Sequence, residues 1–219
     1  MKGDTFWILD PIDGTTNLVH DYQHSTVSLG LYSKGEIILG VIYDPFREEM
    51  FYAEKGKGSF VNGRPIHVAK AENLGQTIIA IGTAPYQKEL APQNFACFQR
   101  VFEKCEDIRR TGSAAMDLAY TAAGRLGGYF EARLQPWDFA AGMLILTEAG
   151  GENTPAQDKK RKKAKEEQQN EKIPHSGTDS GTHHGTGRLR YRAIFPRGQK
   201  QREPVQQNTP LRHRGRHVL

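Results

Sequence analysis

The spacing of apolar residues changes character about a third of the way along the chain. From Ser25 to Tyr32 apolar residues alternate with small or polar ones, the period of a half-buried strand, and Ile37 to Tyr43 is a nearly continuous apolar run typical of a central strand. Shorter runs predict further strands at residues 50–53, 59–61 and 65–68. Asn62-Gly63 separates the last two and is a strong two-residue hairpin signal. The pattern predicts an antiparallel meander.

After this meander, strand-like and helix-like segments alternate. Strands are predicted at residues 77–81 and 126–130, and helices at residues 93–102, 113–123 and 137–148. The second helix is rich in alanine and ends at Gly124, and the third follows Pro136 and ends before Gly150, in keeping with the preferences of helix ends. The fold class expected from this order is α/β, or α+β in layers.

The first strand is expected to end in a turn that carries two carboxylates. Trp7-Ile8-Leu9 is an apolar run, and Pro11 biases Asp10 away from helix, so the strand should stop there. Gly14 supplies freedom at the bend, and Thr15 and Thr16 would cap a helix starting at Asn17. Asp10 and Asp13 beside free backbone N–H groups suit a divalent cation and a phosphate oxygen together. The alternative is an ordinary Asx-turn before a capped helix.

Charge divides the chain more sharply than hydrophobicity does. Residues 1–154 carry 14 Lys and Arg against 19 Asp and Glu, whereas residues 155–219 carry 16 against 6. Only 12 of the 65 residues after Thr154 are hydrophobic, too few to form a core, so this tail is expected to be disordered. We therefore predict an antiparallel part at 1–75, an α/β part at 76–154 and a basic, disordered tail at 155–219.

The cysteines and the longest apolar runs indicate the cellular compartment of the protein. Cys97 and Cys105 lie eight residues apart, a spacing that fits neither a zinc site nor a disulfide framework and favours a reducing compartment. The N-terminus has no apolar signal-peptide core, and no apolar run approaches 18 residues. A cytoplasmic protein without a membrane partner is expected.

Three motifs in the right order resemble those of the inositol monophosphatase family. Residues 7–17, Trp-Ile-Leu-Asp-Pro-Ile-Asp-Gly-Thr-Thr-Asn, are similar to the first family signature. Residues 137–142, Trp-Asp-Phe-Ala-Ala-Gly, followed by Glu-Ala-Gly-Gly at 148–151, are similar to the second, and residues 110–115 resemble the Gly-Ser-Ala-Ala segment between them. The resemblance covers about residues 4–153. It implies a Mg²⁺-dependent phosphatase built from stacked layers of helices and sheets, here incomplete at both ends.

The resemblance also assigns roles to single residues. It implies that Asp10 bridges two Mg²⁺ ions, that the backbone carbonyl of Ile12 ligates the first, and that Asp13 and Asp138 ligate the second. The amides of Gly14 and Thr15 would hold the phosphate, and the Thr15 hydroxyl would help to orient the attacking water. Asp10, Asp13 and Asp138 should then lie close together, with side-chain oxygens roughly 3–6 Å apart. The alternative for Asp138 is a first-turn carboxylate stabilised by its helix.

Further residues are expected to contact the substrate. Glu131 lies seven positions before Asp138, where family members hold a Glu that contacts sugar-alcohol hydroxyls, and Gly112, Ser113 and Ala114 would approach the same ring. The alternatives are a solvated loop Glu and a helix N-cap with close packing.

The function that the resemblance implies is hydrolysis of inositol monophosphate or a similar small phosphate monoester. One rival keeps the chemistry but takes a fructose bisphosphate or a nucleotide bisphosphate. A rival of another class is a non-catalytic fragment whose basic tail binds nucleic acid or other polyanions without sequence preference. Family members are commonly dimers, so a homodimer is expected of a whole relative. They also carry a metal-ligating Glu and a water-activating Asp ahead of the first signature, so weak or no hydrolysis is expected of the chain as given.

Overall fold

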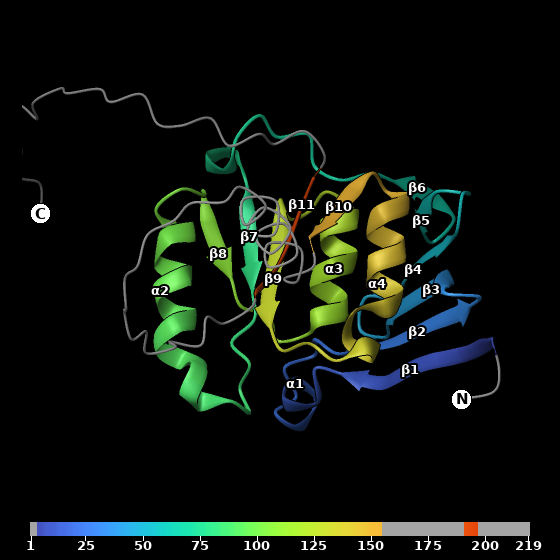
Figure 1. Cartoon of the computed structure of the whole chain (residues 1–219), viewed down its shortest axis with the longest axis horizontal. Helices are drawn as coiled ribbons and strands as arrows, with labels where there is room; N and C mark the ends of the chain where they lie inside the picture. Colours follow the sequence, from blue (N-terminus) through green and yellow to red (C-terminus); the bar gives the residue numbers. More distant parts are fainter. Residues whose placement is uncertain (1–3, 155–190, 197–219) are drawn as a thin grey trace, which may run out of the picture.

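The computed structural model describes residues 4–154 and 191–196, and these residues form layers. Helix α2 (Ala91–Phe102) covers one face of sheet B, and helices α3 (Ala114–Ala122) and α4 (Pro136–Glu148) lie between sheet B and sheet A (Figure 1). The expected architecture of stacked helix and sheet layers is confirmed.

Sheet A contains six antiparallel strands that follow one another in sequence order. Its strands are β1 (Thr5–Asp13), β2 (Thr26–Ser33), β3 (Glu36–Asp44), β4 (Glu49–Glu54), β5 (Ser59–Val61) and β6 (Arg64–Ile66). The predicted meander is therefore correct. At the hairpin between β5 and β6, Asn62 and Gly63 both have positive φ angles, 47° and 78°, as a two-residue turn of this kind requires.

Helix α4 packs directly on sheet A because two strand residues lack side chains. A Cβ added at Gly40 would lie 2.7 Å from the backbone oxygen of Ala141, and one at Gly30 would lie 3.3 Å from the Cβ of Ala140. The helix contributes alanines to this contact, so its backbone comes close to the strands. This close approach fixes the height of α4 above the sheet, and with it the place of Asp138 at the start of the helix.

Sheet B depends on pairings between distant segments. Its order is β10-β11-β9-β7-β8, with β7 parallel to both β8 and β9, and β11 antiparallel to β9 and β10. The strands are β7 (Ile78–Ile81), β8 (Asp107–Arg109), β9 (Gly128–Ala132), β10 (Gly151–Thr154) and β11 (Tyr191–Pro196), and short 3-10 turns span Leu74–Gln76 and Lys88–Leu90. The sequence predicted β7 and β9 but missed the other three.

Strand β11 corrects the prediction for the tail. Disorder was expected for all of residues 155–219, yet residues 191–196 pair with both β9 and β10. The prediction averaged composition over 65 residues and so overlooked the local run Tyr-Arg-Ala-Ile-Phe-Pro, which is rich in residues that favour strands. The other tail residues lie outside the described part of the chain, and their predicted disorder stays a prediction.

The core lies between the two sheets and is built around α3. Met116, Leu118 and Ala119 of this helix are fully buried, and they pack in one cluster with Ile42 of β3 and Ile145 of α4. A smaller cluster joins α2 to sheet B, where the rings of Phe98 and Phe130 lie 5.6 Å apart. In the described part of the chain, no helix has both the length and the apolar character needed to span a bilayer.

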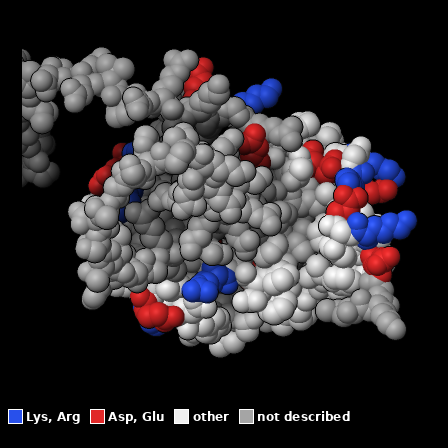
Figure 2. Space-filling view, viewed as in Figure 1, with Lys and Arg blue, Asp and Glu red and all other residues white. Residues whose placement is uncertain are grey.

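The surface is mixed in charge where sheet A meets solvent. Figure 2 shows acidic and basic side chains interleaved at the right-hand edge of the molecule, on the side where Figure 1 places sheet A. Two of the ion pairs at strand ends are Lys55–Glu36 and Lys57–Glu54, and all four side chains are at least half exposed. Such pairs contribute little to stability because solvent screens them.

The turn after β1 differs from the prediction in two ways. The strand runs through Pro11 to Asp13, with a register shift between Asp10 and Asp13. Pro11 is tolerated because β1 is an edge strand and its backbone is irregular at this point. Helix α1 (Thr15–Val19) begins two residues earlier than expected, and its N-cap is Gly14 with φ 85° instead of a threonine.

Candidate metal centre

Three aspartates converge where β1 and α4 meet. Asp10 and Asp13 come from the irregular end of β1 and Asp138 from the first turn of α4, and one carboxylate oxygen of each lies within 4.8 Å of the others. The predicted convergence of these three side chains is confirmed. They are 128 positions apart at the extremes, so only the packing of α4 on sheet A brings them together.

Asp13 is the buried member of the cluster. Its Oδ2 accepts hydrogen bonds from the Ser113 hydroxyl at 2.7 Å and from the Ala115 amide at 2.6 Å. Burial raises the pKa of Asp13 to about 7, and the nearby charges of Asp10 and Asp138 add to the rise, although both hydrogen bonds oppose it. The start of α3 therefore holds one oxygen in place and leaves the other for the cavity.

Asp138 has two roles in the structure. It occupies the third position of α4, where its Oδ2 accepts the Gln135 amide at 2.6 Å, so it caps the helix as the alternative interpretation supposed. Burial raises its pKa, and repulsion from Asp10 and Glu131 contributes. Asp10 in turn accepts the Ile12 amide at 3.0 Å. Each aspartate thus has one oxygen fixed by a backbone amide.

The cluster fits a hard divalent cation. Three carboxylates within 4.8 Å repel one another, and the raised pKa values of Asp13 and Asp138 show that repulsion together with burial disfavours their charged forms. A bound cation would reverse this penalty, and carboxylate and carbonyl oxygens are the ligands that Mg²⁺ prefers.

The turn between β1 and α1 supplies the remaining predicted groups. The Thr15 hydroxyl donates to the Ile12 carbonyl at 2.9 Å, which ties the predicted water-orienting group to the predicted backbone ligand. The Ser25 hydroxyl donates to the Gly14 carbonyl at 2.9 Å and so stabilises the turn. The structure leaves the metal and phosphate roles of Ile12, Gly14 and Thr15 as predictions.

One cavity of about 510 Å³ contains every site residue that the sequence suggested. Its lining includes Asp10, Ile12, Asp13, Gly14, Thr15, Gly112, Ser113, Ala114, Glu131 and Asp138. A cavity of this size can take a small organic phosphate.

Glu131 lines the same cavity as the aspartates and is already hydrogen-bonded. Its Oε1 accepts the Ala84 amide at 3.0 Å, and its Oε2 accepts the Tyr129 hydroxyl at 2.6 Å. The alternative of a solvated loop Glu is wrong, because Glu131 lies within β9 and both of its oxygens have protein partners. Glu131 lines the cavity, and its contact with a substrate hydroxyl stays a prediction.

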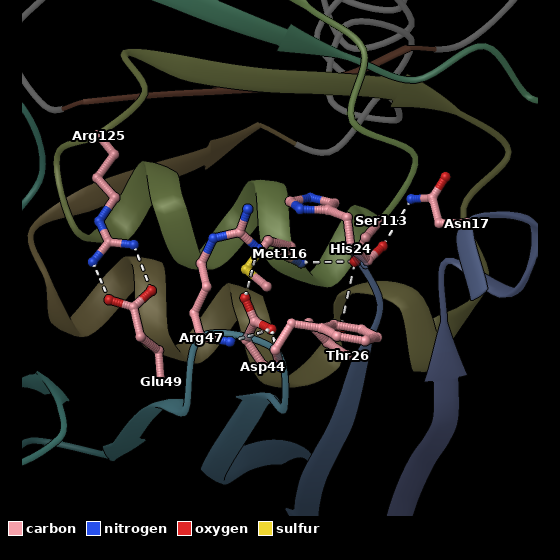
Figure 3. A network of polar contacts seen from close by, with 10 residues as sticks. Asn17, His24, Thr26, Asp44, Arg47, Glu49, Ser113, Met116 and Arg125 are labelled. Carbon is pink, nitrogen blue, oxygen red and sulfur yellow. Dashed lines mark hydrogen bonds and ion pairs between the residues drawn. The ribbon is translucent and has the colours of Figure 1, made fainter. Parts of the chain in front are cut away.

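The segment Gly112–Ala114 forms the predicted helix N-cap. Ser113 precedes α3, its hydroxyl accepts the Met116 amide at 3.3 Å, and it lies 3.4 Å from the Thr26 hydroxyl (Figure 3). Because the same hydroxyl donates to Asp13, this cap links the helix to the metal cluster. Whether the segment also contacts the substrate stays a prediction.

Sequence reasoning missed Asp117, a carboxylate that also lines the cavity. It is 2% exposed, accepts the Thr111 hydroxyl at 2.7 Å, and burial raises its pKa well above the ordinary range. A usable signal was present, because Asp117 is the one charged residue in the otherwise apolar stretch of α3.

Two ion pairs stabilise the β3–β4 turn, and one of them connects it to the segment that follows α3. Figure 3 shows Arg47 reaching the fully buried Asp44 and Arg125 reaching Glu49, on the side of α3 away from Asn17. Arg125 also lies over the ring of Tyr120, 4.7 Å from its centre. The contacts of Arg125 attach the start of β4, after the β3–β4 turn, to the end of α3.

Comparison with known proteins identifies the chain's relatives. The model of the inositol monophosphatase family matches residues 1–184, which extends beyond the 4–153 expected from the motifs. The Nus factor SuhB of Salmonella typhimurium is 46% identical over 148 residues, which are 68% of this chain and 55% of SuhB. The chain therefore spans about half the length of this curated relative.

Solved structures agree with this assignment. An inositol monophosphatase from Anabaena (Nostoc) superposes with a TM-score of 0.68 at 41% identity, covering 71% of this chain and 62% of that one. The extragenic suppressor protein suhB from Bartonella henselae gives a TM-score of 0.71 at 34% identity, covering 90% and 66% respectively. With the family match, the layered fold and the converging aspartates in place, the chain belongs to the inositol monophosphatase family.

Proposed function

We propose that the protein is a Mg²⁺-dependent phosphatase that hydrolyses a small sugar-alcohol phosphate, such as inositol monophosphate, to the alcohol and inorganic phosphate. The observation that carries the proposal is the convergence of Asp10, Asp13 and Asp138 within 4.8 Å, in a cavity that a small organic phosphate would fill. Family membership supports the reaction class.

The residues divide the work by position. Asp10, Asp13 and Asp138, with the Ile12 carbonyl, would hold Mg²⁺, which supplies charge neutralisation for the phosphate and activation of a water molecule. The amides of Gly14 and Thr15 would bind phosphate oxygens. The Thr15 hydroxyl, now bonded to Ile12, would orient the attacking water. Ser113 and Ala115 hold Asp13 in place while the substrate binds.

Other residues of the cavity would orient the leaving alcohol. Glu131 and the segment Gly112–Ala114 line the same cavity, and a substrate with its phosphate at Gly14 would direct its ring toward them. Because the oxygens of Glu131 are fixed by Ala84 and Tyr129, this carboxylate is preorganised to accept hydrogen bonds from hydroxyl groups.

A panel of phosphate esters tests the proposal. Because weak hydrolysis is expected of the chain as given, phosphate release should be slow, should require Mg²⁺, and should be faster from inositol 1-phosphate than from fructose 1,6-bisphosphate or nucleotide bisphosphates. Calorimetric titration with Mg²⁺ measures the metal site separately. A chain that binds no Mg²⁺ and releases no phosphate from any ester would refute the proposal, and preference for a bisphosphate would replace the substrate class.

A further inference from the structure

Asn17 joins α1 to two other segments, those of His24 and Thr111, and residues next to Asn17 and Thr111 line the cavity. It is 8% exposed, and its side-chain amide donates to two backbone carbonyls, that of His24 at 2.8 Å and that of Thr111 at 2.9 Å. Figure 3 shows the amide of Asn17 directed away from α1 toward His24. Both of its N–H groups are used, so the side chain is held by two segments that lie far apart in the sequence.

The packing around Asn17 is as restrictive as its hydrogen bonding. A Cβ added at Gly112 would lie 3.0 Å from both the nitrogen and the oxygen of the Asn17 amide, and Gly112 has φ 93°. A Cβ added at Gly14 would lie 2.9 Å from the His24 carbonyl oxygen, the acceptor of the first hydrogen bond. The turn at Gly14 therefore packs against the His24 carbonyl, and the turn at Gly112 packs against the Asn17 amide.

Each connected segment carries a separate part of the proposed site. Asn17 lies in α1, two residues after Thr15 and three after Gly14. Thr111 precedes Gly112 and Ser113, and Ser113 donates to Asp13. His24 precedes Ser25, which donates to the Gly14 carbonyl. A second link between the same segments runs from Asp13, next to Gly14, to Ser113 and Ala115, and Asn17 adds the link from α1 to Thr111.

We propose that Asn17 is a positioning residue for phosphate-ester hydrolysis, holding the phosphate-binding turn at Gly14 in register with the Gly112–Ser113 segment that supports Asp13 and faces the leaving group. This inference rests on the proposed function. Loss of the two hydrogen bonds would let the two walls shift relative to each other. A misplacement of about 1 Å at reacting groups lowers rates by roughly 100-fold, whereas the metal ligands keep their own amide contacts.

The chain offers a matched control at Asn62. This residue also bridges two backbone segments, since its amide donates to the Glu48 carbonyl at 2.9 Å and accepts the Met50 amide at 2.8 Å. It lies in the exposed β5–β6 turn and does not line the cavity. Replacing it by Leu removes the same kind of contact without touching the site, and it also strains the turn because Asn62 has φ 47°.

The test compares Asn17→Leu, Asn17→Asp and Asn62→Leu in the full chain. Leu has a similar volume but cannot donate, and Asp presents an acceptor to two carbonyls. Both Asn17 variants should lower kcat for inositol 1-phosphate by 10- to 100-fold, with Mg²⁺ affinity changed by less than about threefold. Asn62→Leu should lower Tm by a few degrees and leave kcat unchanged.

The outcomes separate this inference from the proposed function. If Asn17→Leu loses thermal stability as Asn62→Leu does but keeps its kcat at temperatures where it is folded, Asn17 is structural only and the inference is overturned alone. If the unsubstituted chain neither releases phosphate nor binds inositol 1-phosphate in calorimetry, the proposed function fails and takes the inference with it. A loss of Mg²⁺ affinity equal to the loss of kcat would also overturn it, because the effect would then act through the metal.

Discussion

The two walls of the cavity hold their carboxylates in opposite ways. On the wall formed by β1 and α4, Asp10, Asp13 and Asp138 each have one oxygen fixed by a backbone amide, and one carboxylate oxygen of each lies within 4.8 Å of the others. On the other wall, Glu131 has a protein donor on each oxygen. The three carboxylates of the first wall repel one another, and a bound cation would relieve this repulsion. On the second wall, both oxygens of Glu131 already accept hydrogen bonds from the protein. The carboxylates of the first wall therefore suit a cation, and the carboxylate of Glu131 suits a hydrogen-bond donor.

Replacing one aspartate should strongly weaken Mg²⁺ binding by the first wall. Asp138→Asn keeps the size of the side chain but removes one charge and one anionic ligand, so Mg²⁺ affinity and Mg²⁺-dependent phosphate release should each fall by at least about 100-fold, because even partners that only support ligands are worth 10- to 100-fold. Calorimetry and a phosphate-release assay measure the two effects. Asp107→Asn, on the surface in an ion pair with Arg109, is the control and should change neither. Undiminished Mg²⁺ binding in Asp138→Asn would remove Asp138 from the site.

The first wall should also respond to pH in the range set by Asp13. Its pKa in the folded chain is about 7 against an ordinary 3.8, so the folded chain binds a proton between these values that the unfolded chain has released. Two consequences follow. The metal-free fold loses stability as pH rises through about 7, and a metal must displace this proton below that pH.

Titrations at several pH values measure both consequences. Mg²⁺ affinity should fall by up to about tenfold for each unit of pH below 7, where one proton competes with the metal. Urea unfolding of the metal-free chain should give higher stability at pH 5.5 than at pH 8. The variant Asp13→Asn should lose most of the pH dependence of stability between these values. An Mg²⁺ affinity that stays constant from pH 5.5 to 8 would mean that Asp13 is not a ligand.

A substitution of Glu131, on the other wall, should reduce activity less than a substitution of an aspartate. In Glu131→Gln the amide oxygen can still accept the Ala84 amide, and the amide nitrogen can donate to the Tyr129 oxygen, so the hydrogen bonds of this wall survive with one reversed. We expect a loss in kcat/KM for inositol 1-phosphate of about tenfold or less and unchanged Mg²⁺ affinity. A loss as large as that of Asp138→Asn would show that Glu131 acts together with the metal and would end the contrast between the walls.

The smallest effect on the site is expected from the contact that positions α4. In Gly40→Ala the new Cβ would meet the Ala141 backbone oxygen at 2.7 Å, so the helix must move, at a cost of about 1–3 kcal/mol in unfolding free energy. Gly30→Ala, with its nearest contact at 3.3 Å, should cost less and serves as the graded control. Denaturant unfolding measures both. Mg²⁺ affinity in Gly40→Ala should fall only a few-fold, because a helix shift of less than about 1 Å relieves the contact and displaces Asp138 from Asp10 and Asp13 by no more than that.

Much of this fold could be predicted from local patterns. The alternation of β2, the apolar run of β3, the Asn62-Gly63 hairpin and the ends of α4 all arise from interactions between near neighbours, and the structure places them within a few residues of their predicted limits. Strands β8 and β10 were missed because each is short and is stabilised by partners distant in sequence, and β11 was missed because its local run was averaged into the composition of the tail. Local composition carries little information about such pairings.

The same division applies to the site. The sequence by itself determined which residue types gather in the motifs, because carboxylates, glycines and hydroxyls at these spacings are needed to bind a cation and a phosphate, and the cavity contains every residue that it named. Only the tertiary structure decided how those groups are held. It extended β1 through Pro11, placed Gly14 at the cap of α1, satisfied both oxygens of Glu131, and used Asn17 and Ser113 to join the two walls. These features depend on which distant backbone groups meet a buried side chain, and burial is a property of the packed layers, which no short stretch of sequence contains.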